Sequence, residues 1–192
     1  MSKGKLFVIS GASGVGKGTV LKAVMDARED LIFSVSATTR APRPNEVEGV
    51  HYYFVTKERF GEMIADDAFL EYSNHNENYY GTPKDQVEEK LTRGHVVFDI
   101  EPNGAGGIRR TRPDATLIFI MPPSMEELER RLRGRGDTPE DQIAIRLERA
   151  LWEMEQRSWY DHVVVNDQVE DCVREILNII SAVADTNENG GN

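Results

Sequence analysis

The sequence predicts an α/β fold in which a parallel sheet is covered by helices on both faces. Two observations support this prediction. Short, continuous apolar runs recur along the chain, and each is followed by a segment in which apolar residues have helical spacing. Strands that are apolar throughout are typical of parallel sheets buried on both faces. A chain of 192 residues is long enough for one such domain with small appended subdomains.

The elements of the core follow in order along the chain. The first strand is expected at Leu6–Ser10, and a glycine loop separates it from a helix whose apolar positions are Val20, Leu21, Val24 and Met25. Three further strand and helix pairs are expected at 96–99 with a helix after Pro102, at 115–120 with a helix after Ser124, and at 162–165 with a helix from about Val169.

The region from Phe33 to about Pro83 has a different pattern. Alternating or aromatic runs at 33–36, 52–55 and 69–72 indicate strands, with one helix at 57–65. This pattern predicts a small mixed α+β insertion that is mainly antiparallel. Between 133 and 146, two glycines flank an arginine before a helix start, which favours a short mobile lid. We therefore expect a core at 1–33, 85–124 and 147–184, an insertion at 34–84, a lid with its supporting helix at 125–146, and a disordered tail at 185–192.

Composition narrows the classes of partner. The net charge of −10 and the pI of about 4.9 argue against nucleic acid or an anionic membrane, so a phosphate ligand must meet local positive sites. The sequence lacks a signal-peptide pattern and a membrane-length apolar stretch, so we expect a cytoplasmic protein. The single cysteine, Cys172, lies in an apolar-periodic run and is expected to be a buried structural thiol. Histidine spacing indicates no transition-metal site built by the protein.

A phosphate-binding loop follows the first strand and opens the first helix. Its glycines allow backbone N–H groups to turn onto phosphate oxygens, and its lysine reaches the β- and γ-phosphates. Gly18 occupies the position usually held by Ser or Thr, and Thr19 comes next, so Thr19 is the candidate hydroxyl ligand for Mg²⁺. The alternative is a glycine-rich turn with an incidental lysine; the glycine spacing disfavours a dinucleotide site. The residues expected to bind a nucleoside triphosphate are Gly11, Ala12, Ser13, Gly14, Val15, Gly16, Lys17, Gly18 and Thr19.

The segment from Ser36 to Phe54, SATTRAPRPNEVEGVHYYF, resembles the signature of guanylate kinases, and the resemblance extends from about Leu6 to Ile180. It continues through FLE at 69–71, NYYGT at 78–82, DIE at 99–101 and the lid motif at 131–136. The resemblance implies a P-loop nucleoside monophosphate kinase with a GMP-holding insertion and an arginine-bearing lid. Such an enzyme transfers the γ-phosphoryl of ATP to GMP, and we expect also to dGMP, with Mg²⁺, giving ADP and GDP for guanine nucleotide synthesis.

The chemistry of the insertion agrees with a monophosphate acceptor. Arg40 and Arg43 flank a proline on one short turn, and planar guanidinium groups grip phosphate with two donors each. Tyr52 and Tyr80 offer hydroxyl donors to the same phosphate. The alternatives for these residues are a solvated arginine pair and ordinary strand tyrosines.

Guanine presents N–H donors beside a carbonyl acceptor, so its site needs carboxylates and a hydroxyl. The matched candidates are Ser36, Glu71, Thr82 and Glu101. A carboxylate facing the N1 lone pair of adenine would be repelled, which favours GMP over AMP. Glu101 departs from the aspartate usual in the family, and its alternative role is an acid that favours the dipole of the following helix.

Phosphoryl transfer requires positioning and charge neutralisation more than covalent chemistry. We expect Lys17 at the γ-phosphate, and the resemblance places Arg131 on ATP and Arg135 and Arg146 in catalysis. Asp99 is expected to orient Mg²⁺ through water, and Asn166 either touches adenine or forms a turn. Two rival functions are a P-loop kinase for a phosphorylated sugar and a non-catalytic module that binds a protein; the guanine set argues against the first, and Lys17 with the lid arginines against the second.

Overall fold

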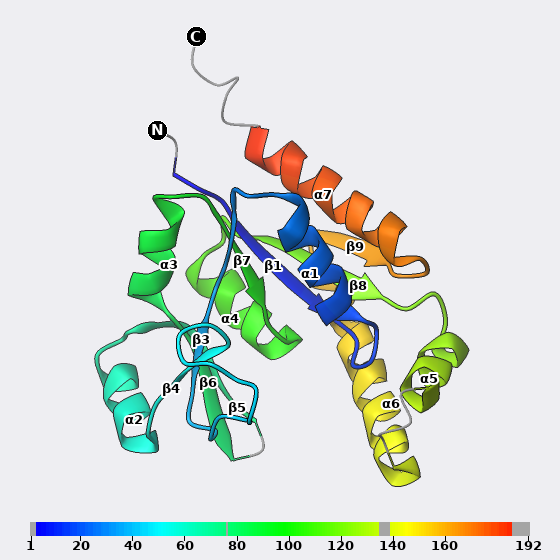
Figure 1. Ribbon diagram of the computed structural model, residues 1–192, viewed down its shortest axis with the longest axis horizontal. Helices are drawn as coiled ribbons and strands as arrows, with labels where there is room; N and C mark the ends of the chain where they lie inside the picture. The colour runs from blue at the N-terminus through cyan, green and yellow to red at the C-terminus, as the bar shows by residue number, and fades with distance from the viewer. Residues whose placement is uncertain (1–2, 76, 135–138, 186–192) are drawn as a thin grey trace. The chain divides into compact units, whose positions relative to one another are not determined.

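The structure is a computed structural model that describes residues 3–75, 77–134 and 139–185 (Figure 1). The chain packs as two compact units. Among the described residues, the first comprises 3–6, 30–75, 77–98 and 103–115, and the second comprises 7–29, 99–102, 116–134 and 139–185. These units are defined by packing. The functional division into core, insertion and lid therefore stays a prediction.

A parallel sheet forms the centre of the second unit. Strand β8 (Thr116–Met121) pairs in parallel with β1 (Leu6–Gly11) and with β9 (His162–Val165). All six residues of β1 are buried, and so are the four central residues of β8. Continuous burial of this kind matches the uninterrupted apolar runs in the sequence. The strands expected at 6–10, 115–120 and 162–165 are therefore confirmed within a residue at each end.

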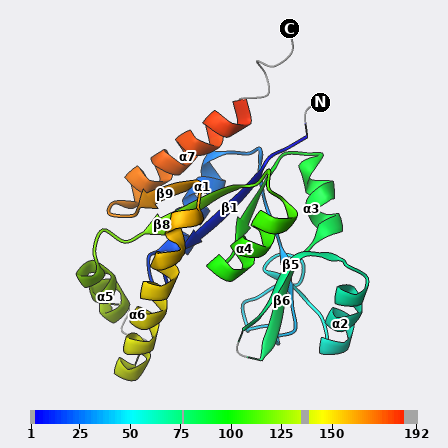
Figure 2. The ribbon, with the colours of Figure 1, turned by 180° about the vertical axis from the view of Figure 1, so that it is seen from behind.

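Helices cover both faces of this sheet. Helix α1 (Lys17–Ala27) packs beside α7 (Val169–Asp185), and both lie in front of the strands in Figure 1. Helices α5 (Met125–Gly134) and α6 (Glu140–Glu155) contact each other, and a 3₁₀ turn, η1 (Gln156–Trp159), follows α6. In Figure 2, which views the opposite face of the sheet, α6 lies in front. The predicted parallel sheet with helices on both faces is confirmed.

Helix α7 buries one face at helical spacing. Cys172, Ile176 and Ile180 recur every four residues and are fully buried. Burial raises the pKa of the Cys172 thiol to about 11, which keeps the sulfur in its neutral form at physiological pH. The prediction of a buried structural thiol is confirmed. Among the described residues, no helix has the length and apolar character that a membrane span requires.

The first unit contains a parallel strand pair and a four-stranded mixed sheet. Strand β2 (Leu31–Phe33) pairs in parallel with β7 (His95–Asp99). The mixed sheet has the order β4-β3-β6-β5. Its strands are β3 (Ser36–Thr38), β4 (Tyr52–Phe54), β5 (Phe69–His75) and β6 (Asn78–Pro83). Strands β3 and β4 run parallel, whereas β6 is antiparallel to both β3 and β5. The predicted mixed, mainly antiparallel insertion is confirmed.

Three helices complete the first unit, and its mixed sheet has a small aromatic core. The helices are α2 (Lys57–Ala65), α3 (Lys84–Leu91) and α4 (Pro102–Thr111). Helix α2 starts at an N-cap threonine, Thr56, whose hydroxyl accepts a hydrogen bond from the Arg59 amide at 3.1 Å. Phe60 of α2 is fully buried and stacks on Phe69 of β5, with 4.5 Å between ring centroids. This packing holds α2 against the sheet.

The strand predicted at 33–36 is wrong. Strand β2 ends at Phe33 and β3 begins at Ser36, so Ser34 and Val35 connect two different sheets. The Ser34 amide donates to the Val97 carbonyl at 2.8 Å, and both linking residues are buried. Alternating apolar and small residues therefore reflect burial here, and do not reflect one continuous strand.

Candidate functional site

The phosphate-binding loop lies between β1 and α1 in the second unit. Gly14 and Gly16 adopt positive φ angles of 88° and 94°. Gly16 is the N-cap of α1, and no side chain caps that end of the helix. Exposed amide groups at a helix N-terminus attract anions, so the loop has the backbone that phosphate binding requires.

Replacing Gly14 with alanine is expected to destabilise this loop. A Cβ at Gly14 would lie 2.5 Å from Cδ2 and 2.9 Å from Cγ of Leu132, which is fully buried, and φ is already positive. Backbone strain and overpacking each cost about 1–3 kcal/mol. We expect the melting temperature of Gly14→Ala to fall by several degrees in calorimetry, by about 4 °C or more. Gly18→Ala is the matched control, because outside its chain neighbours and its own helix backbone no atom lies within 4 Å of its added Cβ. An equal loss in both variants would contradict this explanation.

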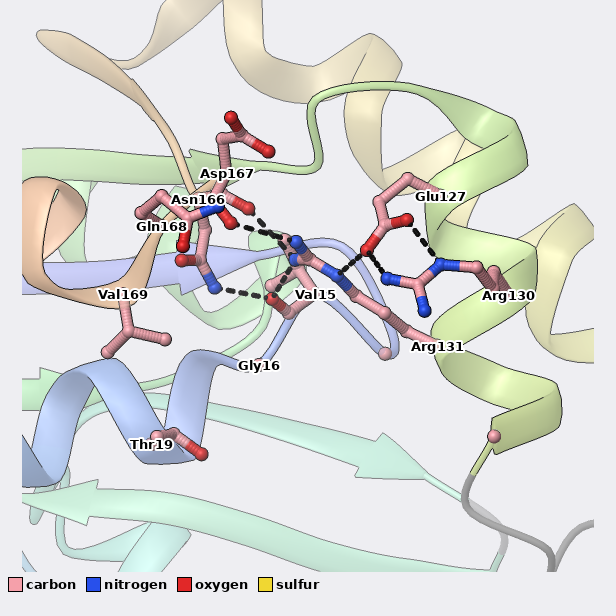
Figure 3. A pocket seen from close by; sticks show the side chains of 12 residues that line it. Val15, Gly16, Thr19, Glu127, Arg130, Arg131, Asn166, Asp167, Gln168 and Val169 are labelled. Carbon is pink, nitrogen blue, oxygen red and sulfur yellow. Dashed lines mark hydrogen bonds and ion pairs between the residues drawn. The ribbon is translucent and has the colours of Figure 1, made fainter.

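A cavity of about 600 Å³ opens beside the loop. It is lined by Gly14, Val15, Gly16, Thr19, Glu127, Arg130, Arg131, Gly134, Asn166, Asp167, Gln168 and Val169. The loop, α5 and the segment after β9 contribute its walls (Figure 3). The volume falls within the range of nucleotide-sized ligand sites.

Hydrogen bonds from Arg131 and Asn166 join the walls of this cavity. The Arg131 guanidinium donates to the Asn166 carbonyl at 2.8 Å, to the Asp167 carbonyl at 3.2 Å and to the Glu127 carboxylate at 2.7 Å. Asn166 is buried, and its amide nitrogen donates to the Val15 carbonyl at 2.8 Å (Figure 3). Asn166 thus supports the loop through its side chain, a role that the sequence did not suggest. The Asn166 Oδ1 is buried and has no hydrogen-bond partner among the described residues.

Lys17, the first residue of α1, forms an ion pair with Asp99 at the end of β7. Burial lowers the pKa of the Lys17 ammonium to about 8, and the nearby acids Glu101 and Glu153 oppose that shift. The structure therefore brings together the two residues that the sequence assigned separately to the phosphate and to the metal. Thr19 lies on the cavity wall, in the first turn of the same helix.

Glu153 of α6 is a buried acid that the sequence analysis did not identify. One of its oxygens accepts a hydrogen bond from the Ser13 amide of the loop at 2.6 Å, and the other accepts from Arg149 at 3.0 Å. Arg149 also pairs with Glu101 at 2.5 Å. Burial raises the pKa of the Glu153 carboxyl, while the Ser13 and Arg149 donors oppose that shift. Glutamates at helical spacing are common, so only the structure distinguishes this one.

The acceptor residues of the first unit form two groups. In the first group, Arg40 donates to Glu46 at 2.8 Å, and its guanidinium lies 5.5 Å from the ring centroid of Tyr52. Glu46 also accepts from the backbone amide of Arg43 at 2.8 Å, and these donors lower the pKa of the Glu46 carboxyl to about 2. The rings of Tyr52 and Tyr80 meet edge to face at 6.0 Å. Glu46, within the quoted signature, thus holds the arginine turn.

The second group contains the buried pair Glu71 and Thr82. The Thr82 hydroxyl donates to Glu71 at 2.6 Å, and both residues are at most 8% exposed. Burial raises the pKa of the Glu71 carboxyl to about 6, although the Thr82 hydrogen bond opposes the shift. Ser36 is half-buried at the start of β3 in the same sheet. A buried carboxylate with one hydroxyl partner suits a ligand that brings further N–H donors.

The remaining predicted residues are distributed as follows. Arg146 is partly buried in α6, in the second unit. Glu101 lies in the second unit, directly before α4, and its side chain is 53% exposed. Arg135 and the centre of the predicted lid lie outside the described residues, as does the tail from residue 186. Asp185, which was assigned to that tail, is the last residue of α7.

Comparison with known proteins gives a consistent result. The family model described as guanylate kinase matches residues 3–183. Guanylate kinases of Thermus thermophilus and Trichodesmium erythraeum are each 48% identical over 94% of this chain, and the match covers 82% and 97% of their lengths. The guanylate kinase of Carboxydothermus hydrogenoformans is 43% identical over 95% of this chain and 90% of its own.

Solved structures agree with the sequence relatives. The guanylate kinase of Anaplasma phagocytophilum is 33% identical with a TM-score of 0.77, over 96% of this chain and 88% of its own. A gluconokinase of Sinorhizobium meliloti is 17% identical with a TM-score of 0.52, over 99% and 98% of the two chains, and shares only the fold. Because the family model spans nearly the whole chain and the relatives match over almost their full lengths, this protein belongs to the guanylate kinase family.

Proposed function

We propose that this guanylate kinase binds ATP along its phosphate loop and the adjoining cavity, and transfers the γ-phosphoryl group to GMP or dGMP held by the residues of the mixed sheet. The observation that carries the proposal is the loop itself. Gly14 and Gly16 turn the backbone, Lys17 begins α1 opposite Asp99, and a cavity of about 600 Å³ opens beside them.

On the ATP side, the loop amides and Lys17 would bind the phosphates, and Arg131 would line the nucleotide cavity. The open acceptor Oδ1 of Asn166 matches the exocyclic amino group of adenine. Arg131 would fix that cavity as well as contact ATP, because its guanidinium already joins four acceptors: the Glu127 carboxylate and the backbone carbonyls of Val15, Asn166 and Asp167. Arg135 and Arg146 are proposed to neutralise the transferring phosphoryl group.

On the acceptor side, Arg40, Arg43, Tyr52 and Tyr80 would bind the monophosphate. The guanine base would contact Glu71, whose carboxylate accepts one hydrogen bond from Thr82 and can accept others from the N–H donors of the base. Ser36 and Thr82 would be its hydroxyl partners, and Glu101 would be a second carboxylate. Glu46 would keep Arg40 in place until a phosphate competes for its donors. These assignments rest on the family membership and on the contacts within each unit.

Magnesium fits the donors that the second unit offers. Mg²⁺ keeps several waters and is usually bound by one or two carboxylates together with substrate phosphates. Asp99 supplies such a carboxylate and Thr19 a hydroxyl, whereas the described residues contain no cluster of three His, Cys, Asp or Glu side chains that could hold a metal alone. Mg²⁺ bound with ATP would neutralise charge on the β- and γ-phosphate oxygens.

The chain's own residues would then perform two tasks. Lys17, in its charged form, would hold the γ-phosphate, and Arg40 and Arg43 would fix the acceptor phosphate. An oxygen of the GMP phosphate bonds to the γ-phosphorus as the bond to the bridging oxygen of ADP breaks. Positioning of these two phosphates is the main contribution of the protein.

The proposal is tested by measuring ADP release with ATP, Mg²⁺ and each of GMP, dGMP, AMP, CMP and UMP. We expect turnover with GMP and dGMP only, because Glu71 in its charged form repels the N1 lone pair of adenine. A phosphorylated ribose, the kind of acceptor that the rival kinase would use, is tested in the same assay. Turnover with this sugar phosphate and not with GMP would favour the rival kinase, whereas a lack of turnover with every acceptor would favour a binding module. Either result would overturn the proposed acceptor.

A further inference from the structure

We propose that Arg149 is a positioning residue that fixes Glu101 for guanine recognition and ties it, through Glu153, to the phosphate loop. The inference rests on the proposed function for its assignment of Glu101 to guanine. Arg149 has no role in the sequence analysis, and every contact in the argument lies within the second unit.

The contacts form one continuous chain. Arg149 binds Glu101 at 2.5 Å through Nη2 and Glu153 at 3.0 Å through Nε. Glu153 then accepts from the Ser13 amide at 2.6 Å. A guanidinium is planar and its donors have fixed directions, so the two carboxylates are held at a fixed separation. Two side chains, Arg149 and Glu153, thereby connect the candidate acceptor carboxylate Glu101 to the loop proposed to bind ATP.

Burial makes the part of this contact network around Glu153 rigid. The Glu153 side chain is only 4% exposed, so its carboxylate requires its two donors to remain in the fold. Arg149 is partly buried with its side chain 33% exposed, and the Glu101 side chain is 53% exposed. Glu153 and the loop are therefore the ordered end of this network of contacts, and Arg149 holds the more exposed Glu101 against that end.

The length of Glu101 explains why it needs such a partner. Glutamate has one methylene more than the aspartate usual in the family, and each added rotatable bond costs conformational entropy when the carboxylate is ordered. An exposed glutamate alone would sample many positions. The Arg149 fork limits those positions before the nucleotide binds, which is preorganisation of a binding group. Arg149 thus acts on guanine through Glu101 and without touching the base.

The experiment is a double-mutant cycle with Arg149→Met and Glu101→Asp, in which KM for GMP, KM for ATP and kcat are measured for all four proteins. Loss of a hydrogen bond between charged groups corresponds to about tenfold in affinity. We expect Arg149→Met alone to raise KM for GMP about tenfold, with a change in KM for ATP of about threefold or less. In the Glu101→Asp background, the shorter side chain cannot reach Arg149 in this geometry, so Arg149→Met is expected to raise KM for GMP by less than about twofold.

Arg149→Lys serves as a conservative variant and guards against a folding defect. An ammonium group cannot bridge both carboxylates as the guanidinium fork does, so we expect a KM for GMP between those of the wild type and Arg149→Met. Equal increases in both KM values, or the same increase in both Glu101 backgrounds, would overturn the proposal and leave Arg149 as a support of the loop. Failure of the proposed function is distinguished by the wild-type protein, which would then show no turnover with GMP at all.

Discussion

Lys17→Met is expected to lower kcat for GMP phosphorylation by about 10³-fold, the scale seen when a preorganised charge is removed from a transition state. Lys17 is the loop lysine, and it lies at the N-terminus of α1 against Asp99. Methionine has a similar length but no charge, so the substitution removes the electrostatic contribution and leaves the volume. Steady-state and single-turnover rates with saturating ATP and GMP give the measurement.

Lys22→Met is the matched control for this substitution. Lys22 lies on the same helix, its side chain is 75% exposed and its partner is Asp26, one turn away. Exposed ion pairs of this kind contribute little to stability. Unchanged kcat in Lys22→Met together with the loss in Lys17→Met would assign the effect to the site. A Lys17→Met protein that retains a tenth or more of the wild-type kcat would contradict the role of Lys17, since the expected loss is about 10³-fold.

The same residue predicts how activity depends on pH. The charged form of Lys17 binds phosphate, and burial lowers its pKa to about 8, so the free enzyme loses the active form as pH rises above about 8. We expect kcat/KM for ATP to decline in that range. Bound phosphates stabilise the ammonium, so the corresponding decline in kcat should occur at higher pH. Lys17→Met should show neither decline.

The elements that the sequence predicted best are those whose pattern has one interpretation. The runs at 6–10 and 162–165 are apolar except for Ser10 and His162 at their ends, and they form β1 and β9. The strand predicted at 33–36 was wrong because Ser34 and Val35, which link two sheets, are buried, and their sequence has the same alternation of apolar and small residues as a strand. Strand β6 was not expected, because its aromatic and glycine residues matched a family motif and gave no clear period.

The candidate site shows the same division. The loop residues and the pair Glu71 and Thr82 follow from motif and resemblance, and the structure places the latter two in direct contact. Glu153 and Arg149 could not be predicted, because their roles depend on α6 meeting the loop, which no local pattern specifies. Charged residues on a helix are usually solvated. Only burial and a partner distant in sequence identify the exceptions.

Glu71→Gln is expected to lower kcat/KM for GMP by about 10²-fold at pH 8, because a charged hydrogen-bond acceptor contributes about 1.5–3 kcal/mol. The amide replaces one acceptor oxygen by a donor nitrogen, which would face the N–H donors of guanine. Glu71 is buried and already accepts from Thr82. Competition assays with GMP and AMP measure the loss of discrimination. Glu62→Gln is the control, because that glutamate is 63% exposed on α2 in the same unit; an equal loss there would contradict the assignment.

Stability and pH separate this role of Glu71 from a structural one. Burial raises its pKa from 4.5 to about 6, so between these values the folded protein binds more protons than the unfolded chain, and stability falls as pH rises through that window. The charged form costs about 2 kcal/mol of stability above pH 6. Glu71→Gln should therefore melt no lower than wild type at pH 8 while binding GMP poorly. The kcat/KM for GMP should fall more steeply below about pH 6 in the wild type than in the variant, because protonation of Glu71 converts an acceptor oxygen to a donor. The phosphate of GMP also titrates at about pH 6, but it affects both proteins equally. The charged Glu71 carboxylate lowers stability while it provides an acceptor for the ligand. If Glu71→Gln leaves the melting temperature unchanged or higher and weakens GMP binding, the role of Glu71 is to bind the ligand and not to stabilise the fold.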